Sequence, residues 1–375
     1  MTFQAIYRTE AGRGCTFHSL VGASGEPEAY CCILDGSSQR LPQNVLASTR
    51  LIQISLSPRQ LRTQLRRQAK NLEQKLQLID ALDLCRVPIT KEFRTARAFV
   101  LAPESARSSH AWTLAADLWK HVTQSENVRV VTQPDYDQME FAHHWVGLLD
   151  CPSFHTKHVP SAVATVDTYT SVLGTLLPAR DAPTISVIGV GELGGRICDA
   201  FLNAGNPVIA FDIDPRRCEP FANRKGFSAA PSVRDALTSG AAATVFCARA
   251  NSLSVSVARI LARTGGTLCV GGPEAGLDRN AQALRVLRDG RIHFIPSVLC
   301  GSLGLAANLE EVLGVHVDLE RARLRLADHV AAVIREMHLR NELFDESWVS
   351  YTQSIMGAAH LEFQEHGSSR ADDLE

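Results

Sequence analysis

The sequence predicts an α/β fold with two domains. Its 375 residues suffice for two hydrophobic cores, and 45% hydrophobic with 21% charged residues is typical of globular rather than disordered proteins. Segments with strand and helix patterns alternate along most of the chain, which favours strands covered by helices. The stretch ISVIGVGELGGR at 185–196 joins an apolar strand to a helix through glycines. This pattern is typical of the loop between the first strand and the first helix of a parallel α/β sheet.

The N-terminal half predicts a sheet with helices. Apolar runs at 29–35 and 49–56 are rich in residues that favour strands. Ser57 can cap a helix whose first turn contains Pro58, and leucines then recur at three- and four-residue steps. The elements that we expect after this helix are a strand at 97–102, a helix over about 105–121 and a strand at 127–132.

The C-terminal half alternates more regularly, after an irregular region at 133–160. A helix over 161–177 precedes the glycine-rich stretch, and the chain is helical again from about Leu303. Between them we expect strands at 184–189, 207–212, 243–248, 267–271 and 291–295, with helices at 192–204, 231–238, 253–264 and 279–288. The expected domains are residues 1–160 and 161–329, followed by a helical segment over 330–365 and a flexible tail over 366–375.

The glycines of the motif have the spacing of a dinucleotide-binding turn. Gly189 permits the tight turn, Gly191 lets the backbone approach a diphosphate, and Gly194 lets the helix pack closely on the strand. Amide groups at the start of the helix attract an anion. The sequence therefore predicts a Rossmann-type dinucleotide-binding domain over 161–329.

The acid that ends the next strand indicates which dinucleotide binds. Asp212 ends PVIAFD, eighteen residues after Gly194. A carboxylate there accepts hydrogen bonds from the ribose hydroxyls of NAD and repels the 2′-phosphate of NADP. Arg216 and Arg217 follow closely and leave room for NADP, but the acid favours NAD.

Charge and composition argue against several other functions. A formal net charge of −2 gives no general attraction to nucleic acid or to an anionic membrane. No apolar run reaches about 18 residues and no signal sequence is evident, so we expect a cytoplasmic protein. The ten cysteines form no CxxC pair, and the histidines of 143–158 have no metal-site spacing, so we expect no metal. His143, His144 or His155 are instead candidate acid/base groups.

Four further segments carry a family resemblance. They read AYCCILD with LASTRL near the N-terminus, RRQAKNLEQK in the long helix, PSAVATVDTY before the glycines, and IPSVLCGSLGLAANLEEVLG around residue 300. By their order and spacing, over roughly 20–360, the chain resembles the superfamily of glutamate, leucine, phenylalanine and valine dehydrogenases, nearest its leucine/phenylalanine branch.

The resemblance implies a reversible oxidative deamination. Hydride passes from Cα of an L-amino acid to the nicotinamide of NAD, and the imine is hydrolysed to a 2-oxo acid. The family implies an amino-acid-like small molecule as substrate and a homo-oligomer, dimer or higher, formed through the N-terminal hairpin. It also implies that the helices of 330–365 pack back on the first domain.

The resemblance implies catalytic groups in the first domain. Lys75 matches the lysine that binds the substrate carboxylate, and it shares a helix face with Leu72 and Ile79. Asp135 matches the catalytic aspartate, with Asp137 as the alternative.

The family's second lysine has no clear match. In the family it follows three glycines and precedes an apolar strand, but this sequence has no glycine triplet there. Alignment on the strand places Arg97 at that position, and Lys91 lies six residues earlier. Arginine keeps the positive charge but does not carry protons near neutral pH, so we expect either a changed mechanism or a loop that brings Lys91 into the site.

Other matched positions also differ. Ser161 and Thr165 match a Pro-Ser…Thr stretch with the threonine displaced by one place, Glu274 lies where an asparagine precedes the nicotinamide, and Gly301 replaces an asparagine that touches the substrate. We therefore expect a non-standard substrate. The expected cofactor contacts are Gly189, Gly191, Glu192, Leu193, Gly194, Asp212, Ile213, Cys247, Ala248 and Thr165.

Three functions follow from this pattern. The first is an NAD-dependent amino-acid dehydrogenase, acting in biosynthesis on an altered amino acid or an imine. The second is a lyase or cyclising enzyme that retains NAD and returns the hydride within one turnover. The third is a non-catalytic NAD-binding protein. Lys75, Asp135 and the complete cofactor motif favour the first.

Overall fold

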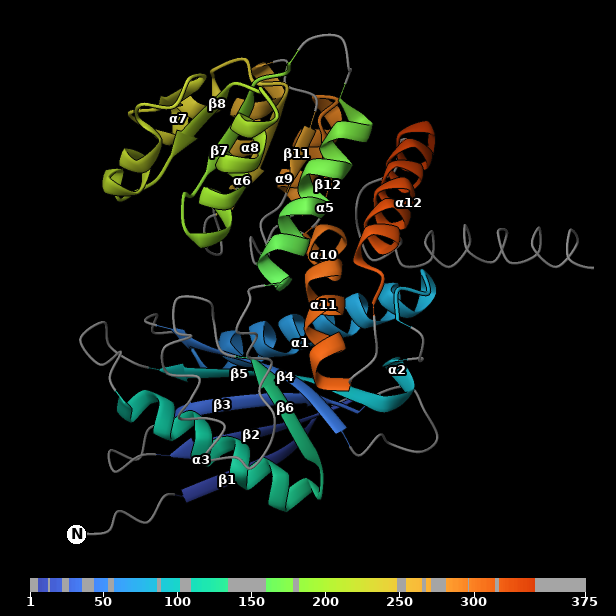
Figure 1. Ribbon diagram of the computed structural model, residues 1–375. Coiled ribbons are helices and arrows are strands. Elements are labelled where there is room, and N and C mark those ends of the chain that lie inside the picture. The colour runs from blue at the N-terminus through green and yellow to red at the C-terminus, as the bar shows by residue number, and fades with distance from the viewer. Residues whose placement is uncertain are drawn as a thin grey trace, which may run out of the picture. The chain divides into compact units, whose positions relative to one another are not determined.

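The computed structural model divides the chain into two compact units (Figure 1). The first unit contains Met1–Asp80, Cys85–His158 and Asn308–His316, and the second contains Ala81–Leu84, Val159–Ala307 and Val317–Glu375. The residues that the structure describes are 6–12, 14–21, 27–35, 44–52, 57–85, 89–101, 109–133, 160–177, 182–247, 254–264, 268–270, 281–295, 297–313 and 317–340.

The first unit contains a mixed sheet with the strand order β1-β2-β3-β5-β4-β6. Its strands are β1 (Ile6–Gly12), β2 (Cys15–Val21), β3 (Pro27–Leu34), β4 (Asn44–Ile52), β5 (Phe93–Leu101) and β6 (Arg129–Gln133). Neighbours from β1 to β5 are antiparallel, whereas β4 runs parallel to both β5 and β6. Because β5 is central, both of its faces are covered.

Helices α1 (Pro58–Ala81) and α3 (Ser109–Glu126) cover opposite faces of this sheet (Figure 1). Leu61, Leu65 and Ala69 of α1 pack against Phe99, while Trp119 of α3 packs against the other face. The Trp119 ring N–H donates to the Thr49 hydroxyl at 2.9 Å, which satisfies a buried polar group. The hydrophobic periodicity of each helix therefore corresponds to one sheet face.

The ends of α1 follow local capping rules. The Ser57 amide donates to the Gln60 side-chain oxygen at 3.0 Å, and Pro58 occupies the first turn. At the other end, the Asp80 carboxylate accepts from the amides of Ile89 and Thr90 at 2.6 and 2.8 Å. Asp80 thus holds the short helix α2 (Ile89–Glu92) against the end of α1.

The second unit contains a parallel sheet with the order β12-β11-β10-β7-β8-β9. Its strands are β7 (Ile185–Ile188), β8 (Val208–Phe211), β9 (Phe227–Ala229), β10 (Ala243–Phe246), β11 (Leu268–Val270) and β12 (His293–Ile295). Counted from β7, this is the order 3-2-1-4-5-6 of a Rossmann domain, with the chain reversing direction across the sheet between β7 and β10.

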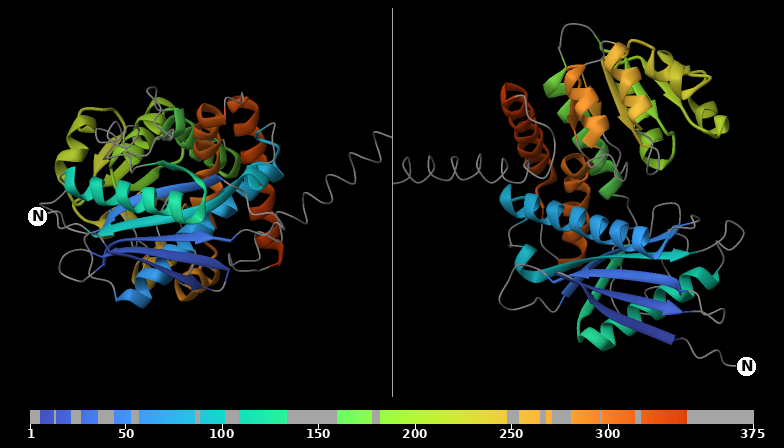
Figure 2. Two further views of the ribbon diagram at one scale, coloured as in Figure 1. Left: turned by 90° about the horizontal axis from the view of Figure 1, so that it is seen from below. Right: turned by 180° about the vertical axis from the view of Figure 1, so that it is seen from behind.

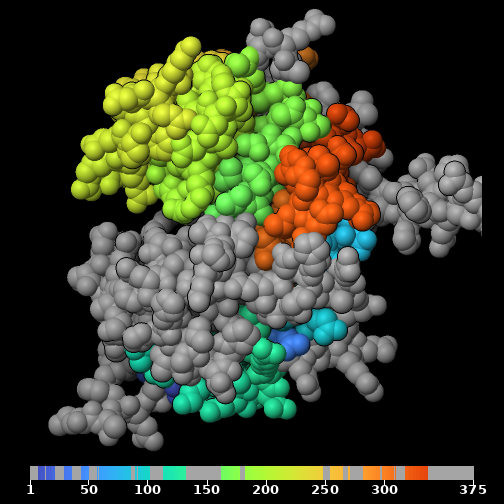
Figure 3. All heavy atoms as spheres, viewed as in Figure 1, coloured from blue at the N-terminus to red at the C-terminus, as the bar shows by residue number. Residues whose placement is uncertain are grey.

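Helices form two layers on this sheet. In one layer, α6 packs on β7 and β8 and against α5, and α5 contacts α12. In the other layer, α8 contacts both α7 and α9. Figure 3 shows α5 beside α12, and Figure 2 shows the other layer from behind. The bounds are α5 (Pro160–Leu176), α6 (Glu192–Asn203), α7 (Val233–Leu237), α8 (Val255–Thr264), α9 (Ala281–Asp289), α10 (Ser297–Cys300) and α12 (Leu319–Arg340), with a 3-10 helix η3 (Pro215–Phe221). Helix α11 (Ser302–Leu313) begins in the second unit, and its residues from Asn308 onward belong to the first.

The α/β fold with a Rossmann-type domain and a C-terminal helical segment is confirmed. Strand β5 is longer than expected and begins at Phe93 rather than at residue 97, because it pairs with β4 from Asn44 onward. Strand β9 was not expected. Its three residues are too few for a strand pattern, and it forms by pairing with β8. That residues 330–365 pack on the first domain stays a prediction, since 341–375 lie outside the described residues.

Among the described residues, no helix combines the length and apolar character needed to cross a membrane.

A buried polar cluster lies between the first sheet and α3. The His18 ring is 1% exposed, with Nδ1 3.2 Å from the Thr9 hydroxyl and Nε2 3.3 Å from the Glu126 carboxylate. Arg94 Nη1 lies 3.9 Å from the same carboxylate, and the His121 ring meets that of His18 edge-on at 5.9 Å. Burial above all, with the nearby His121 and Arg94, lowers the pKa of His18 from 6.5 to about 4.

We predict that this histidine makes the protein sensitive to acid. Because the pKa of His18 is lower in the folded chain, the unfolded chain binds more protons as the pH falls from about 6.5 to about 4. The contribution of neutral His18 to the free energy of unfolding is complete above this pH window and is lost within it. At pH 5 the loss from this group is about 2 kcal/mol. Urea denaturation at pH 7 and pH 5 should therefore show a smaller acid loss for His18→Gln than for the wild type. An equal loss in both proteins would contradict the assignment.

Candidate functional site

The turn after β7 has the geometry of a diphosphate-binding loop. Gly189 has φ +93°, a backbone conformation that favours glycine, and its amide donates to the Phe211 carbonyl at 2.7 Å. Gly191 is the residue before α6 and has no side chain to cap the helix. The first amides of α6 are therefore left for an external acceptor, as in helices that bind phosphate.

The third glycine is required by packing. A Cβ atom added to Gly194 would lie 1.9 Å from the Gly189 carbonyl oxygen and 3.2 Å from Cβ of Cys247. A separation of 1.9 Å from backbone is impossible without moving either the helix or the turn. The neighbouring Gly195 differs, since its added Cβ would meet only the Phe221 ring, at 3.7 Å.

Asp212 is fixed at the carboxyl end of β8. One carboxylate oxygen accepts from the Val190 amide at 2.6 Å and the other accepts from the Asp214 amide at 2.9 Å. Its side chain is 7% exposed. The first bond ties the acid to the glycine turn, so the expected ribose acceptor and the expected diphosphate loop form one rigid structure.

The residues around this acid complete the binding surface. Ile213, which was expected to contact the cofactor, follows Asp212 and is 94% exposed. Glu192 begins α6, and its carboxylate is paired with Arg196 one turn later at 2.6 Å. This pairing reduces the repulsion that an acid in the first turn would exert on a diphosphate. Leu193 lies in the same turn and is half-buried.

Cys247 follows β10 and borders the turn from the other side. Its amide donates to the Ile188 carbonyl at 2.7 Å. Burial above all, with the neighbouring thiols of Cys198 and Cys300, raises the pKa of Cys247. The thiol is therefore neutral and serves as packing, not as a nucleophile. Thr165 is buried in α5 of the same unit, and Ala248 lies outside the described residues.

The predicted cations of the first unit occupy three different elements. Lys75 is half-buried on α1, between the buried Gln74 and Leu76. Lys91 belongs to α2, and its side chain lies outside the described residues. Arg97 was expected as the first residue of a strand, but it lies in the middle of β5, where it is buried and Nη1 donates to the Ser48 hydroxyl at 2.5 Å.

Several predicted residues lie outside the described part of the chain. They are Asp135, Asp137, Glu274, and the histidines at 143, 144 and 155, together with the side chain of Ser161. Gly301 is buried between α10 and α11. Within the described ranges, no three histidine, cysteine or acidic side chains are grouped to hold a metal ion.

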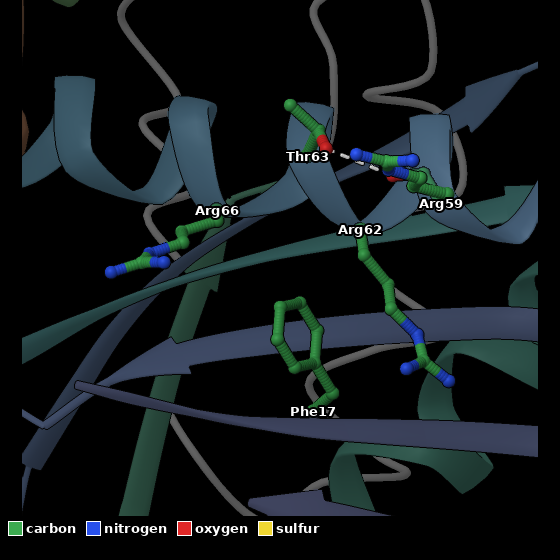
Figure 4. Close-up of a pocket in the computed structure, with 5 residues that line it drawn as sticks. All are labelled: Phe17, Arg59, Arg62, Thr63 and Arg66. Carbon is green, nitrogen blue, oxygen red and sulfur yellow. Dashed lines mark hydrogen bonds between the residues drawn. The ribbon is translucent and has the colours of Figure 1, made fainter. Parts of the chain in front are cut away.

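A basic hollow lies on the first turns of α1. Arg62 is paired with Glu10 at 2.7 Å, and its guanidinium carbon lies 5.8 Å from the centre of the Phe17 ring. Figure 4 shows that the Arg62 and Arg66 guanidinium groups point away from each other on either side of this ring. We assign the hollow no ligand because its cations do not converge. It is lined by Phe17, Arg59, Arg62, Thr63 and Arg66.

Two arginines near the turn were not assigned a role from the sequence. The spacing of four residues between Glu192 and Arg196 was a signal for an ion pair on one helix face. For Arg217 the sequence indicates only that it follows Asp212 closely and leaves room for NADP. Its approach to the turn depends on how η3 folds back, which no local pattern indicates.

The comparisons with known proteins agree with this geometry. Residues 184–256 match a family model described as the NAD binding domain of 6-phosphogluconate dehydrogenase. No curated protein matches the sequence. The cofactor is therefore NAD(P), bound by the second unit.

Solved structures with a similar fold cover most of this chain. The L-tryptophan dehydrogenase from Nostoc punctiforme is 13% identical, with 88% of this chain and 93% of that chain covered and a TM-score of 0.61. The hetero-hexameric glutamate dehydrogenase from Thermus thermophilus is 14% identical, with coverages of 95% and 88% and a TM-score of 0.63. The glutamate dehydrogenase from Plasmodium falciparum is 12% identical, with coverages of 97% and 83% and a TM-score of 0.58. At these identities the likeness concerns the fold.

We predict that Gly194→Ala abolishes NADH binding, because the new methyl group collides with the Gly189 carbonyl and displaces the turn. The matched control is Gly195→Ala, which has room and replaces glycine within a helix, so it should bind NADH normally and gain about 0.5–1 kcal/mol of stability. Fluorescence titration with NADH and thermal unfolding measure both effects. Normal binding by Gly194→Ala would show that the turn is not the cofactor site.

Proposed function

We propose that the chain is an NAD-dependent oxidoreductase of the amino-acid dehydrogenase type. The observation that carries the proposal is the rigid unit of glycine turn, α6 and Asp212. The proposed substrate class is supported by the resemblance of sequence segments in both halves and by a fold similar to those of tryptophan and glutamate dehydrogenases. The proposed reaction transfers hydride between the nicotinamide and Cα of an L-amino acid or a related imine.

The surroundings of Asp212 support NAD rather than NADP. The Asp212 carboxylate accepts hydrogen bonds only from neutral backbone amides among the bonds that the structure shows, and the acid lies at the end of β8 where the ribose would bind. Arg216 is held by two bonds of 2.9 Å to Asp214 and is therefore occupied. A 2′-phosphate would meet the Asp212 charge at short range.

The substrate groups proposed for the first unit are Lys75, Lys91 or Arg97, and Asp135. The bound nicotinamide supplies the hydride acceptor or donor. In the proposal, the Lys75 ammonium binds the substrate carboxylate, and Asp135 moves protons at the amine. A guanidinium remains protonated near neutral pH, so Arg97 can bind an anion but cannot carry a proton, which leaves that task to Lys91 or to a histidine of 143–158. This difference supports a non-standard substrate.

One observation favours a second candidate, a non-catalytic NAD-binding protein. Arg97 is buried within β5 and bonded to Ser48, a structural position for the residue that aligns with the family's second lysine. The two candidates share the cofactor site and differ in turnover.

We also propose that the protein is cytoplasmic and forms a homo-oligomer. Strand β1 is an edge strand of the first sheet, and its residues 7–12 are exposed. Such an edge can pair with a second copy.

We predict that Asp212→Asn shifts the cofactor preference from NADH toward NADPH. The amide cannot accept both backbone bonds and carries no charge, so NADH affinity should fall by about tenfold, while NADPH affinity stays constant or rises. The control Asp199→Asn removes a carboxylate from α6 that is paired with Arg224, and it should change neither affinity. Fluorescence titrations with both cofactors give the ratio. Equal loss for NADH and NADPH would reduce Asp212 to a purely structural role.

We predict NADH formation from at least one L-amino acid in an absorbance assay at 340 nm with aliphatic, aromatic and larger substrates. Lys75→Ala should lower kcat/KM by about a hundredfold, because the substrate carboxylate loses its cation, while NADH affinity is unchanged. Lys70→Ala, on the same helix, serves as the control. If no substrate reacts but NADH binds, the non-catalytic candidate is favoured.

A further inference from the structure

Three carboxylates lie at the start of α6 and directly after β8, and two of them are paired with close arginines. Glu192 is paired with Arg196 at 2.6 Å. Asp214 receives two parallel bonds from Arg216, both of 2.9 Å. These pairs are local, since each joins residues two or four positions apart on one element.

The third carboxylate, Asp212, accepts its hydrogen bonds from backbone amides instead of from an arginine. Its oxygens accept from the Val190 and Asp214 amides, and Nη1 of Arg217 approaches no closer than 4.0 Å. Arg217 is 54% exposed. Its guanidinium is therefore near the acid without being bound by it as Arg196 and Arg216 are bound by theirs.

The backbone of η3 holds Arg217 in this place. The Asp214 side chain accepts from the Arg216 amide and caps η3, and the Arg217 amide donates to the Asp214 carbonyl at 3.1 Å. Cys218 and Phe221, the buried residues of η3, fix it to the domain. The arginine therefore extends from an anchored turn rather than from a free loop.

The guanidinium lies beside the place where a diphosphate would bind. Nη1 is 3.1 Å from the position that a Cβ atom on Gly191 would occupy. Gly191 is the residue whose lack of a side chain lets a diphosphate approach the first amides of α6. These amides and the helix dipole supply only a partial positive charge, whereas a diphosphate carries about two negative charges next to Asp212.

We infer that Arg217 binds the diphosphate of the cofactor. The inference rests on the proposed cofactor site and assigns the diphosphate, not a 2′-phosphate, as the partner of the guanidinium. Arg217 completes the site by supplying the full positive charge that the helix lacks, through charge-assisted hydrogen bonds.

The test compares Arg217→Met with the wild type by calorimetric titration of NADH, ADP-ribose, adenosine and 2′,5′-ADP. Methionine keeps most of the side-chain length and removes the charge. We expect NADH and ADP-ribose to bind at least tenfold more weakly and adenosine to bind as before. Arg217→Lys should recover part of the loss. The control Arg224→Ala removes a cation that is paired with Asp199, away from the turn, and should change nothing.

Two outcomes would overturn the inference. Unchanged ADP-ribose affinity in Arg217→Met would show that the guanidinium does not touch the diphosphate. A loss confined to 2′,5′-ADP would assign Arg217 to a 2′-phosphate. Failure of the wild type to bind NADH or ADP-ribose would instead refute the proposed function itself. Thermal unfolding of each variant establishes that the domain is folded.

Discussion

Helix α6 lies so close to the turn before it that residue 194 has no room for a side chain. The carbonyl of Gly189 occupies that space, and Gly189 adopts φ +93° to place it there. This approach brings the first amides of α6 over the end of β7, where the Val190 amide also reaches the Asp212 carboxylate. The parallel order 3-2-1-4-5-6 then places the turn beside the point where the sheet changes direction, which is where such sheets bind ligands.

Each of the three acids near this turn has an arginine close to it, but the arginines have two different roles. The pairs of Glu192 with Arg196 and of Asp214 with Arg216 are short and exposed, and they contribute little to stability. Their effect is to neutralise acids that would repel an anion. Asp212 is instead satisfied by backbone amides, so its nearby Arg217 keeps its bonding capacity for a ligand. Arg97 of the first unit differs from the exposed Arg217, since Arg97 is buried in β5 and donates to the Ser48 hydroxyl.

The sequence predicted the second unit better than the first, and the reason is physical. The glycines, Asp212 and the start of α6 belong to one continuous motif, so local spacing determines them. Strand β5 extends to Phe93 because it pairs with β4, about fifty residues earlier in the chain, and no local pattern carries that information. The same long-range pairing places Arg97 in the sheet interior. The neighbourhood of Arg217 likewise depends on how η3 folds back toward Gly191, so its position became evident only in three dimensions.

The most direct test of the proposed amino-acid dehydrogenase activity follows the hydride itself. The protein is incubated with NAD and a mixture of L-amino acids that carry deuterium at Cα, and the cofactor, both released and bound, is analysed by mass spectrometry. We expect deuterium at C4 of the nicotinamide in NADH, with a 2-oxo acid as the partner product. NAD that binds but acquires no deuterium, in solution or on the protein, would contradict the assignment of an amino-acid dehydrogenase activity.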